Sequence, residues 1–213
     1  MQYTPKPGSG QLFKNPVLEF LTRTPAFIAY TIYPAIALFL LYLSFIRNDF
    51  SVLLTMSVFS AGVLFWSFFE YIAHRYIFHW VSNIAGANRF VYTVHGIHHD
   101  YPKDKDRLIM PPIPWIFLVT VIHFALRLII GEWAFAFESG MIFGYLGYIY
   151  VHYQVHTNKP PKFMKKLMIH HALHHYKYPH LAFGVSSTLW DHIFRTMPPK
   201  ERPNIKNANN PNF

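Results

Sequence analysis

Three long apolar runs constrain this chain more than any other feature of its 213 residues. Residues 26–46 and 51–69 contain no charged side chain, and residues 113–151 are mostly apolar, with a break at 131–133. A helix that crosses a bilayer needs about 20 such residues, and at about 1.5 Å of rise per residue the third run is long enough for two crossings. The sequence therefore predicts an all-α integral membrane protein in which four transmembrane helices form two hairpins.

Lysine and arginine gather outside these runs rather than along one face of a helix, which argues against a nucleic-acid partner despite the net charge of +9. Most of them lie before the first run, between the hairpins, or after the last run. By the positive-inside rule, both termini and the middle segment lie in the cytosol. We expect one domain over residues 1–213, with a cytosolic N-terminal segment at 1–25 that lacks a cleavable signal peptide. Residues 200–213 are expected to form a flexible tail.

Two charged side chains, Arg127 and Glu138, lie within the second predicted hairpin. They are nearly equidistant from the turn at Glu132, so on antiparallel helices they could pair with each other. We expect a structural pair or side chains that reach the interface. His123, in the same hairpin, is expected to form a hydrogen bond between helices.

Histidine is over-represented, with 14 residues, and cysteine is absent. Ten histidines form four groups, and each group lies just cytosolic of a predicted span. They are His74 and His79; His95, His98 and His99; His152 and His156; and His171, His174 and His175. Residues at i, i+3 and i+4 share a face of a helix, so each of the last three groups could direct its imidazoles toward one point. The i, i+5 spacing of the first group indicates a helix end or a π-bulge.

These ten imidazoles predict a metal site in a cytosolic, histidine-rich helical cap. Ten ligands are too many for one ion but suit two, with about five histidines each, whereas a structural zinc site is closed by four ligands. Imidazole alone does not select among zinc, copper, iron and nickel. A membrane metal transporter is a remote alternative, because transporters bind their ions near the midplane of the bilayer and these histidines lie outside the spans.

The histidine groups are embedded in longer motifs that resemble a known family. The run Glu70-Tyr71-x-x-His74-Arg75-x-x-Phe78-His79 is similar to the first box of the membrane fatty acid hydroxylase and sterol desaturase superfamily. Four further runs resemble, more narrowly, the fatty acid 2-hydroxylases that act on sphingolipid acyl chains. They are His95-Gly96-x-His98-His99-x-x-Pro102-x-Asp104-x-x-Arg107-Leu108-x-x-Pro111-Pro112, His152-Tyr153-x-x-His156 with His170-His171-x-x-His174-His175, and Phe183-Gly184-Val185-Ser186-Ser187-x-x-Trp190-Asp191.

This resemblance implies a di-iron monooxygenase that uses dioxygen as co-substrate to hydroxylate a lipid, with C2 of a ceramide-like acyl chain as the expected position. Carried over residue by residue, the ten histidines are the metal ligands, and zinc can replace iron in purified protein. Glu70 and Asp191 are candidates for side chains that support the ligands, and His170 is left outside the ligand set. Aromatic residues at the depth of the acyl chain either line its site or anchor the interface; they are Trp66, Phe68, Phe69 and Tyr148.

Two departures from the family pattern affect the expected electron donor and the expected substrate. The chain has no room for the fused haem-binding domain of many eukaryotic members, so electrons are expected from a separate reductase with a ferredoxin or haem carrier. For the same reason, a bacterial inner membrane is favoured over the endoplasmic reticulum. Ile149 stands where the 2-hydroxylases have Asp. A carotenoid or sterol hydroxylase or desaturase of the same superfamily therefore remains the alternative.

Overall fold

The computed structural model describes residues 5–47, 49–84, 86–157 and 161–199, and within these ranges it contains helices and loops but no strand. The tail expected at 200–213 lies outside the described residues. The elements in chain order are α1 (Pro16–Leu21), α2 (Ala26–Arg47), α3 (Val52–Ile72), η1 (Ala73–Phe78), α4 (Ala87–Val91), η2 (Tyr92–Gly96), α5 (Ile97–Asp100), η3 (Lys105–Arg107), α6 (Pro112–Ile130), η4 (Gly131–Trp133), α7 (Ala134–Thr157), η5 (Lys162–Met164), α8 (Lys165–Tyr176) and α9 (Leu189–Ile193).

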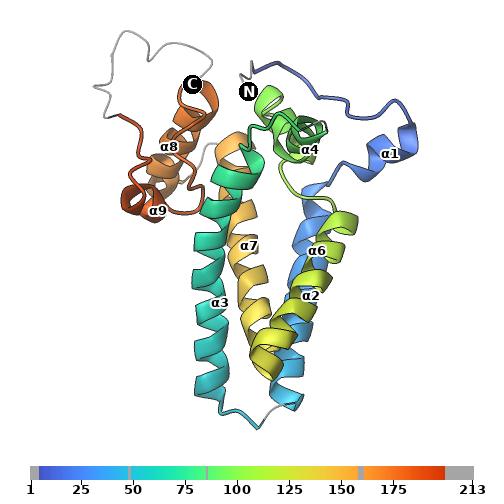
Figure 1. The fold of residues 1–213 in the computed structure, drawn as a ribbon, viewed down its shortest axis with the longest axis vertical. Helices are drawn as coiled ribbons and strands as arrows, with labels where there is room; N and C mark the ends of the chain where they lie inside the picture. Colours follow the sequence, from blue (N-terminus) through green and yellow to red (C-terminus); the bar gives the residue numbers. More distant parts are fainter. Residues whose placement is uncertain (1–4, 48, 85, 158–160, 200–213) are drawn as a thin grey trace.

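The long helices α2, α3, α6 and α7 run side by side, and the short elements other than η4 form a cap at one end (Figure 1). Their boundaries agree closely with the predicted apolar runs, and η4 breaks the third run at 131–133 as expected. By length and composition the described residues contain three candidate membrane spans, Ala26–Arg47, Val52–Phe78 and Lys105–Thr157, the last of which contains both α6 and α7. Large apolar side chains on the outer faces, such as Leu53 and Leu64, are 79% and 70% exposed, as expected for surfaces that contact lipid.

α3 and α7 pack with their backbones almost in contact. A Cβ atom built at Gly62 would lie 2.0 Å from the carbonyl oxygen of Phe137, and one at Gly140 would lie 1.9 Å from that of Phe59. Small residues permit such close approach between membrane helices, where close packing replaces the hydrophobic effect as the driving force. The Ser139 hydroxyl also donates a 2.7 Å hydrogen bond to the carbonyl of Ala37, which ties α7 to α2.

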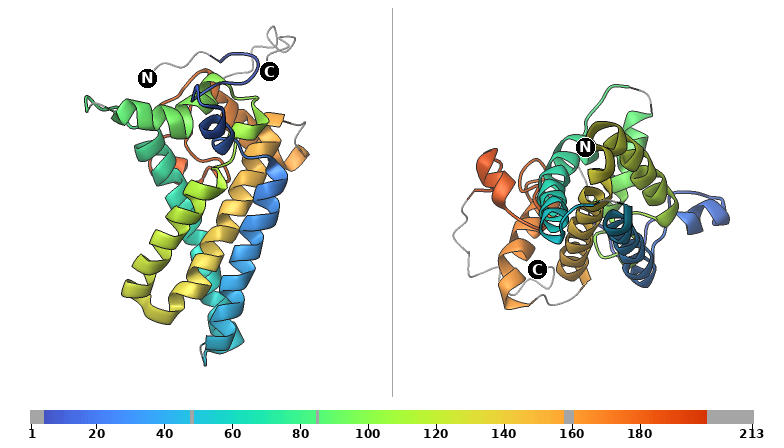
Figure 2. Two further views of the ribbon diagram at one scale, coloured as in Figure 1. Left: turned by 90° about the vertical axis from the view of Figure 1, so that its right-hand side faces the viewer. Right: turned by 90° about the horizontal axis from the view of Figure 1, so that it is seen from below.

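α6 begins at Pro112, a favoured first helical residue, and ends at Ile130. The residue that follows is Gly131, whose φ of 57° is readily adopted by glycine. From η4, α6 and α7 diverge toward the cap (Figure 2). At the cap end, the ring of Trp115 stacks on Tyr33 of α2 at 3.9 Å. The Tyr33 hydroxyl also donates a 2.5 Å hydrogen bond to the carbonyl of Met110.

Near η4, the pair that the sequence suggested between Arg127 and Glu138 is not formed. Arg127 pairs with Glu132 rather than with Glu138. Glu138 instead contacts His123, with 2.5 Å between its Oε2 atom and Nδ1 of the imidazole, so the predicted hydrogen bond between helices is confirmed. Arg127 lies beside the turn, one helical turn beyond His123, and Glu132 in the turn is the carboxylate within its reach.

The N-terminal segment is fastened to the cap by the buried guanidinium of Arg107, whose side chain is 1% exposed. This side chain donates 3.1 Å hydrogen bonds to the carbonyl of Gly10 and to the hydroxyl of Thr22. It also pairs with Glu19, which accepts hydrogen bonds from the backbone N–H groups of Leu12 and Phe13. Residues before the first long helix are therefore packed against the second histidine motif.

Candidate metal centre

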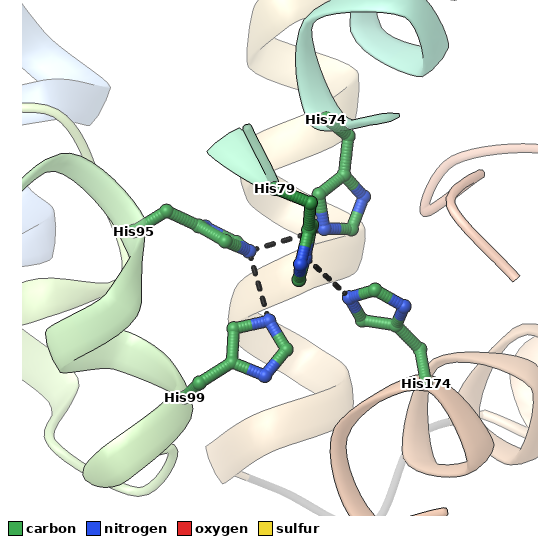
Figure 3. Close-up of side chains that lie close together, drawn as sticks. All are labelled: His74, His79, His95, His99 and His174. Carbon is green, nitrogen blue, oxygen red and sulfur yellow. Dashed lines mark hydrogen bonds between the residues drawn. The ribbon is translucent and has the colours of Figure 1, made fainter. Parts of the chain in front are cut away.

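All ten histidines of the four sequence groups come together in the cap, where they form two clusters of five. We name them site A (His74, His79, His95, His99 and His174) and site B (His98, His152, His156, His171 and His175). Within each cluster the nearest ring nitrogens lie within 4.8 Å of one another. The site A side chains point toward one another from three separate segments of the chain (Figure 3).

A π-helix brings His74 and His79 to the same cluster. η1 covers Ala73–Phe78 and ends at His79, and it continues directly from α3. In a π-helix the hydrogen bonds join residues i and i+5, so this spacing places the two imidazoles on one face. The sequence indicated a helix end or a π-bulge here, and the structure has a π-helix that ends next to His79. A second π-helix, η2 over Tyr92–Gly96, holds His95 and was not expected from the sequence.

We expected the second and fourth sequence groups each to direct their imidazoles toward one point. The structure shows instead that each group is divided between the two clusters. His95 and His99 belong to site A, but His98 belongs to site B. His171 and His175 belong to site B, but His174 belongs to site A. Residues i and i+4 are only about 40° apart around a helix, whereas i+3 lies about 60° to the other side of i. Each segment therefore lies between the two sites and supplies ligands to both.

α7 supplies the remaining pair, and both of its histidines face site B. His152 and His156 are one helical turn apart, and their ring centroids lie 4.8 Å from each other. Nε2 of His152 is 3.0 Å from Nε2 of His98, and Nε2 of His156 is 2.9 Å from that of His171. The close packing of α7 on α3 thus sets the position of site B relative to site A.

Backbone carbonyls fix the ring orientation of three histidines. Nδ1 of His74 lies 2.5 Å from the carbonyl oxygen of Phe183, and Nδ1 of His174 lies 2.7 Å from that of Leu181. Nδ1 of His152 lies 3.1 Å from the carbonyl oxygen of Leu108. A carbonyl only accepts, so in each ring Nδ1 donates its proton and Nε2 keeps a lone pair that faces the cluster. Metal-binding histidines are commonly oriented in this way.

Glu70 and Asp191, which the sequence predicts to support the ligands, hold the loop that carries two of these carbonyls. Glu70 accepts hydrogen bonds from the backbone N–H groups of Val185 and Ser186, at 2.8 and 2.9 Å. Asp191 accepts from the N–H groups of Phe183 and Gly184 at 3.0 and 2.8 Å. Both carboxylates therefore act on His74 through residues 183–186 rather than by direct contact.

His170, which was left outside the ligand set, contacts the same loop anchor. Its Nε2 atom lies 2.9 Å from Oδ2 of Asp191. The hydroxyl of Thr196 donates a 2.7 Å hydrogen bond to the other oxygen of that carboxylate. Hydrogen bonds from the Thr196 hydroxyl, His170 and the Gly184 backbone outweigh burial and lower the pKa of Asp191, so this buried carboxylate is ionised at neutral pH.

Burial keeps the imidazoles of the cap neutral. It lowers the pKa of each of six histidines well below the usual value, and the neighbouring imidazoles lower it further; the six are His95, His98, His99, His171, His174 and His175. Neutral imidazole is the form that binds a metal. Nε2 of His95 lies 3.1 and 3.0 Å from Nε2 of His74 and His99, and it has at most one proton to share. This donor set fits a cation at the centre of each cluster.

An apolar cavity of about 760 Å³ opens beside both sites. Imidazoles from both clusters line its cap end, and residues of α3, α6 and α7 line its length down to Glu138. Trp66, Phe69 and Tyr148, three of the four aromatic residues noted in the sequence, line it as well, whereas Phe68 packs against Trp190 at 4.8 Å. Ile149, which replaces the family Asp, is fully buried in the core between the helices and does not line the cavity.

Comparison with known proteins identifies a family and a similar fold. A family model described as fatty acid hydroxylase matches residues 59–196, which include all ten histidines. A solved structure of full-length scs7p, in which only the hydroxylase domain is visible, superposes with a TM-score of 0.84 at 33% identity. The match covers 92% of this chain and 75% of that one.

Curated relatives at this level of identity carry related names. The ceramide very long chain fatty acid hydroxylase of Saccharomyces cerevisiae is 37% identical over 89% of this chain and 50% of its own length. The fatty acid 2-hydroxylase of Mus musculus is 35% identical over 73% of this chain and 44% of its own length. This chain thus spans about half the length of those two. The dihydroceramide fatty acyl 2-hydroxylase FAH2 of Arabidopsis thaliana is 34% identical over 88% of this chain and 80% of its own length.

These relatives come from a yeast, a mammal and a plant, so they give no support to the expected preference for a bacterial inner membrane. They agree with the superfamily and with the narrower branch that the histidine motifs resembled. The matched region also covers the π-helix η1, the loop at 183–186 and Asp191. The chain therefore belongs to the fatty acid hydroxylase family.

Proposed function

We propose that this protein is a di-iron, dioxygen-dependent lipid hydroxylase that acts at C2 of the acyl chain of a ceramide-like membrane lipid. The observation that carries this proposal is the junction of two five-histidine clusters with one long apolar cavity. The four long helices cross the membrane as two hairpins, with the cap and both termini on the cytosolic side, in agreement with the basic residues that surround the cap.

The ten histidines would hold two iron ions, five at site A and five at site B. Bound there, the irons would activate dioxygen and supply the oxidising power that the insertion of oxygen into an unactivated C–H bond requires, which side chains cannot provide. The protein keeps the imidazoles neutral and turns the Nε2 lone pairs of His74, His152 and His174 inward. It does so with backbone carbonyls, which restrict rotation of these rings.

The cavity would position the substrate. His74, His95, His98 and His152 line its cap end, where the polar head of a lipid would stay at the interface while the acyl chain enters between α3, α6 and α7. Neighbouring methylene groups differ little in reactivity, so placement decides which one is hydroxylated. A carbon beside the acyl carbonyl lies at the level of the head group, next to the histidines. The apolar lining fits an alkyl chain, and the relatives named as ceramide or fatty acid hydroxylases support this substrate over a carotenoid or sterol.

Electrons would come from a separate reductase with a ferredoxin or haem carrier. A metal transporter would need a route for ions through the spans, whereas both clusters lie in the cap and the cavity below them is apolar. The surface that receives an electron donor would lie on the exposed part of the cap, in which basic side chains such as Lys165 and Lys166 are exposed.

Metal content tests the assignment of the ligands. We expect two irons per chain in the parent, and His99→Ala and His171→Ala should each lose about one metal and nearly all activity, because removal of one buried ligand leaves the others unable to hold the ion. His180→Ala is the matched control, since His180 is exposed and lies outside both clusters. Full metal content in either ligand variant would refute the assignment. Zinc in a purified sample would call for iron reconstitution, because imidazole binds both metals.

Product analysis tests the reaction. The protein should be expressed with a reductase in a host that lacks 2-hydroxy lipids, under labelled dioxygen. We expect 2-hydroxy acyl chains that carry the label when the lipids are hydrolysed and analysed by mass spectrometry. Label from water, or hydroxyl groups on sterols or carotenoids alone, would refute the proposed reaction.

A further inference from the structure

The cavity below the metal centre ends on a single buried polar group, the carboxyl of Glu138. This side chain is 1% exposed, and it lines the cavity together with apolar residues of α6 and α7. Its Oε2 atom contacts Nδ1 of His123 at 2.5 Å. Its Oε1 atom is buried and has no hydrogen-bond partner among the described residues.

One face of α7 connects this carboxyl to the metal centre. Along that face the residues that line the cavity recur every three or four positions: Glu138, Met141, Ile142, Tyr145, Tyr148 and His152. The contact between His123 and Glu138 joins α6 to α7 close to the turn at η4, where the two helices converge (Figure 2). Glu138 therefore lies at the closed end of the space and His152 at the open end.

The distance between these two ends defines the length of chain that fits. Glu138 and His152 are separated by about 21 Å, at about 1.5 Å of rise per residue. An extended alkyl chain advances about 1.3 Å per carbon, given C–C bonds of about 1.5 Å, so about 16 carbons fit along this face. The apolar part of one bilayer leaflet is about 15 Å deep, so the closed end lies beyond the midplane.

We propose that Glu138, held by His123, is a specificity-determining residue that limits the length of the acyl chain. A chain that stops short leaves space in which water can hydrogen bond to Oε1 of Glu138. A longer chain would press its methyl end against this oxygen and leave a buried polar atom without a partner, which is unfavourable. This inference rests on the proposed lipid substrate and adds the limit on its length.

The test compares two ceramides in the same vesicles, one with an acyl chain shorter than about 16 carbons and one longer by about half. For the parent we expect the shorter lipid to be hydroxylated about tenfold faster. Glu138→Met, which has a similar shape without the polar atoms, should reduce this preference to about twofold or less. Glu138→Gln keeps a polar end and should retain the preference. Because both products are measured in one sample, their ratio does not depend on the amount of folded protein.

Thermal stabilisation of the purified protein by each ceramide gives a second measurement that needs no turnover. The shorter lipid should raise the melting temperature of the parent more than the longer one, and this difference should disappear in Glu138→Met. If the parent hydroxylates neither lipid, the proposed function fails, while the melting temperatures still test the length limit. Equal ratios in the parent and Glu138→Met, or loss of the preference in Glu138→Gln as well, would overturn the inference.

Discussion

Two of the helices that pack against α7, α3 and α6, approach it in opposite ways. Against α3, the glycines at 62 and 140 bring the backbones so close that a single added carbon would overlap a carbonyl oxygen. Against α6, Trp115 contacts the ring of Tyr145 near the cap and His123 contacts Glu138 near the turn, and a cavity of about 760 Å³ opens between the helices. Under the proposed function, metal ligands on separate helices need a rigid frame, whereas a lipid chain needs space. The contact of α3 with α7 would then serve the first need and the separation of α6 from α7 the second.

The largest effect is expected from a side chain placed between α3 and α7. Gly140→Val would put Cβ 1.9 Å from the carbonyl oxygen of Phe59, so the helices must separate. Overpacking typically costs about 1–3 kcal/mol and occasionally more. Here the clashing atom is backbone, so we expect a cost above this range and loss of bound metal. Melting temperature and metal content measure this.

The control for this variant lies on the same helix. A Cβ at Gly147 meets no atom within 4 Å. Gly147→Ala should therefore leave metal content unchanged and stabilise the helix by up to about 1 kcal/mol. Equal destabilisation by the two substitutions would show that close contact with α3 is not what holds α7 in place.

A smaller effect is expected where α6 meets α2. Trp115 is 4% exposed and stacks on Tyr33, so Trp115→Ala should cost about 3 kcal/mol. We expect both metals to remain bound, because neither cluster contains a residue of α6, while the rate of lipid hydroxylation falls as the wall of the cavity loosens. Loss of metal in this variant would contradict the division of tasks between the two helix pairs.

The smallest effect is expected on the outer face of α6. Leu128 is 89% exposed and does not line the cavity below the metal centre. Leu128→Ala should change stability by no more than about 0.5 kcal/mol, with metal content and activity unchanged. A strong loss of folded protein would mean that this face packs against another protein rather than against lipid.

The sequence by itself determined the long helices, the turn at 131–133 and the ten histidines that cluster. Runs of apolar residues long enough to cross a bilayer restrict the backbone to helices, because every peptide group must then be bonded within its own segment. The i, i+5 spacing of His74 and His79 even indicated the π-helix η1. These features depend on residues close together in the chain, so local spacing was sufficient to predict them.

Only the tertiary structure decided how the histidines divide between the two sites. His98 and His99 are neighbours in sequence but belong to different clusters, because each cluster is completed by residues from distant helices. The loop at 183–186, which Glu70 and Asp191 hold against His74, and the pairing of His123 with Glu138 rather than of Arg127 with Glu138 also depend on contacts between remote segments. Spacing along one helix fixes the direction of a side chain relative to its own axis. What that side chain meets is set by the position of the other helices, which here depends on a glycine contact that brings α3 against α7.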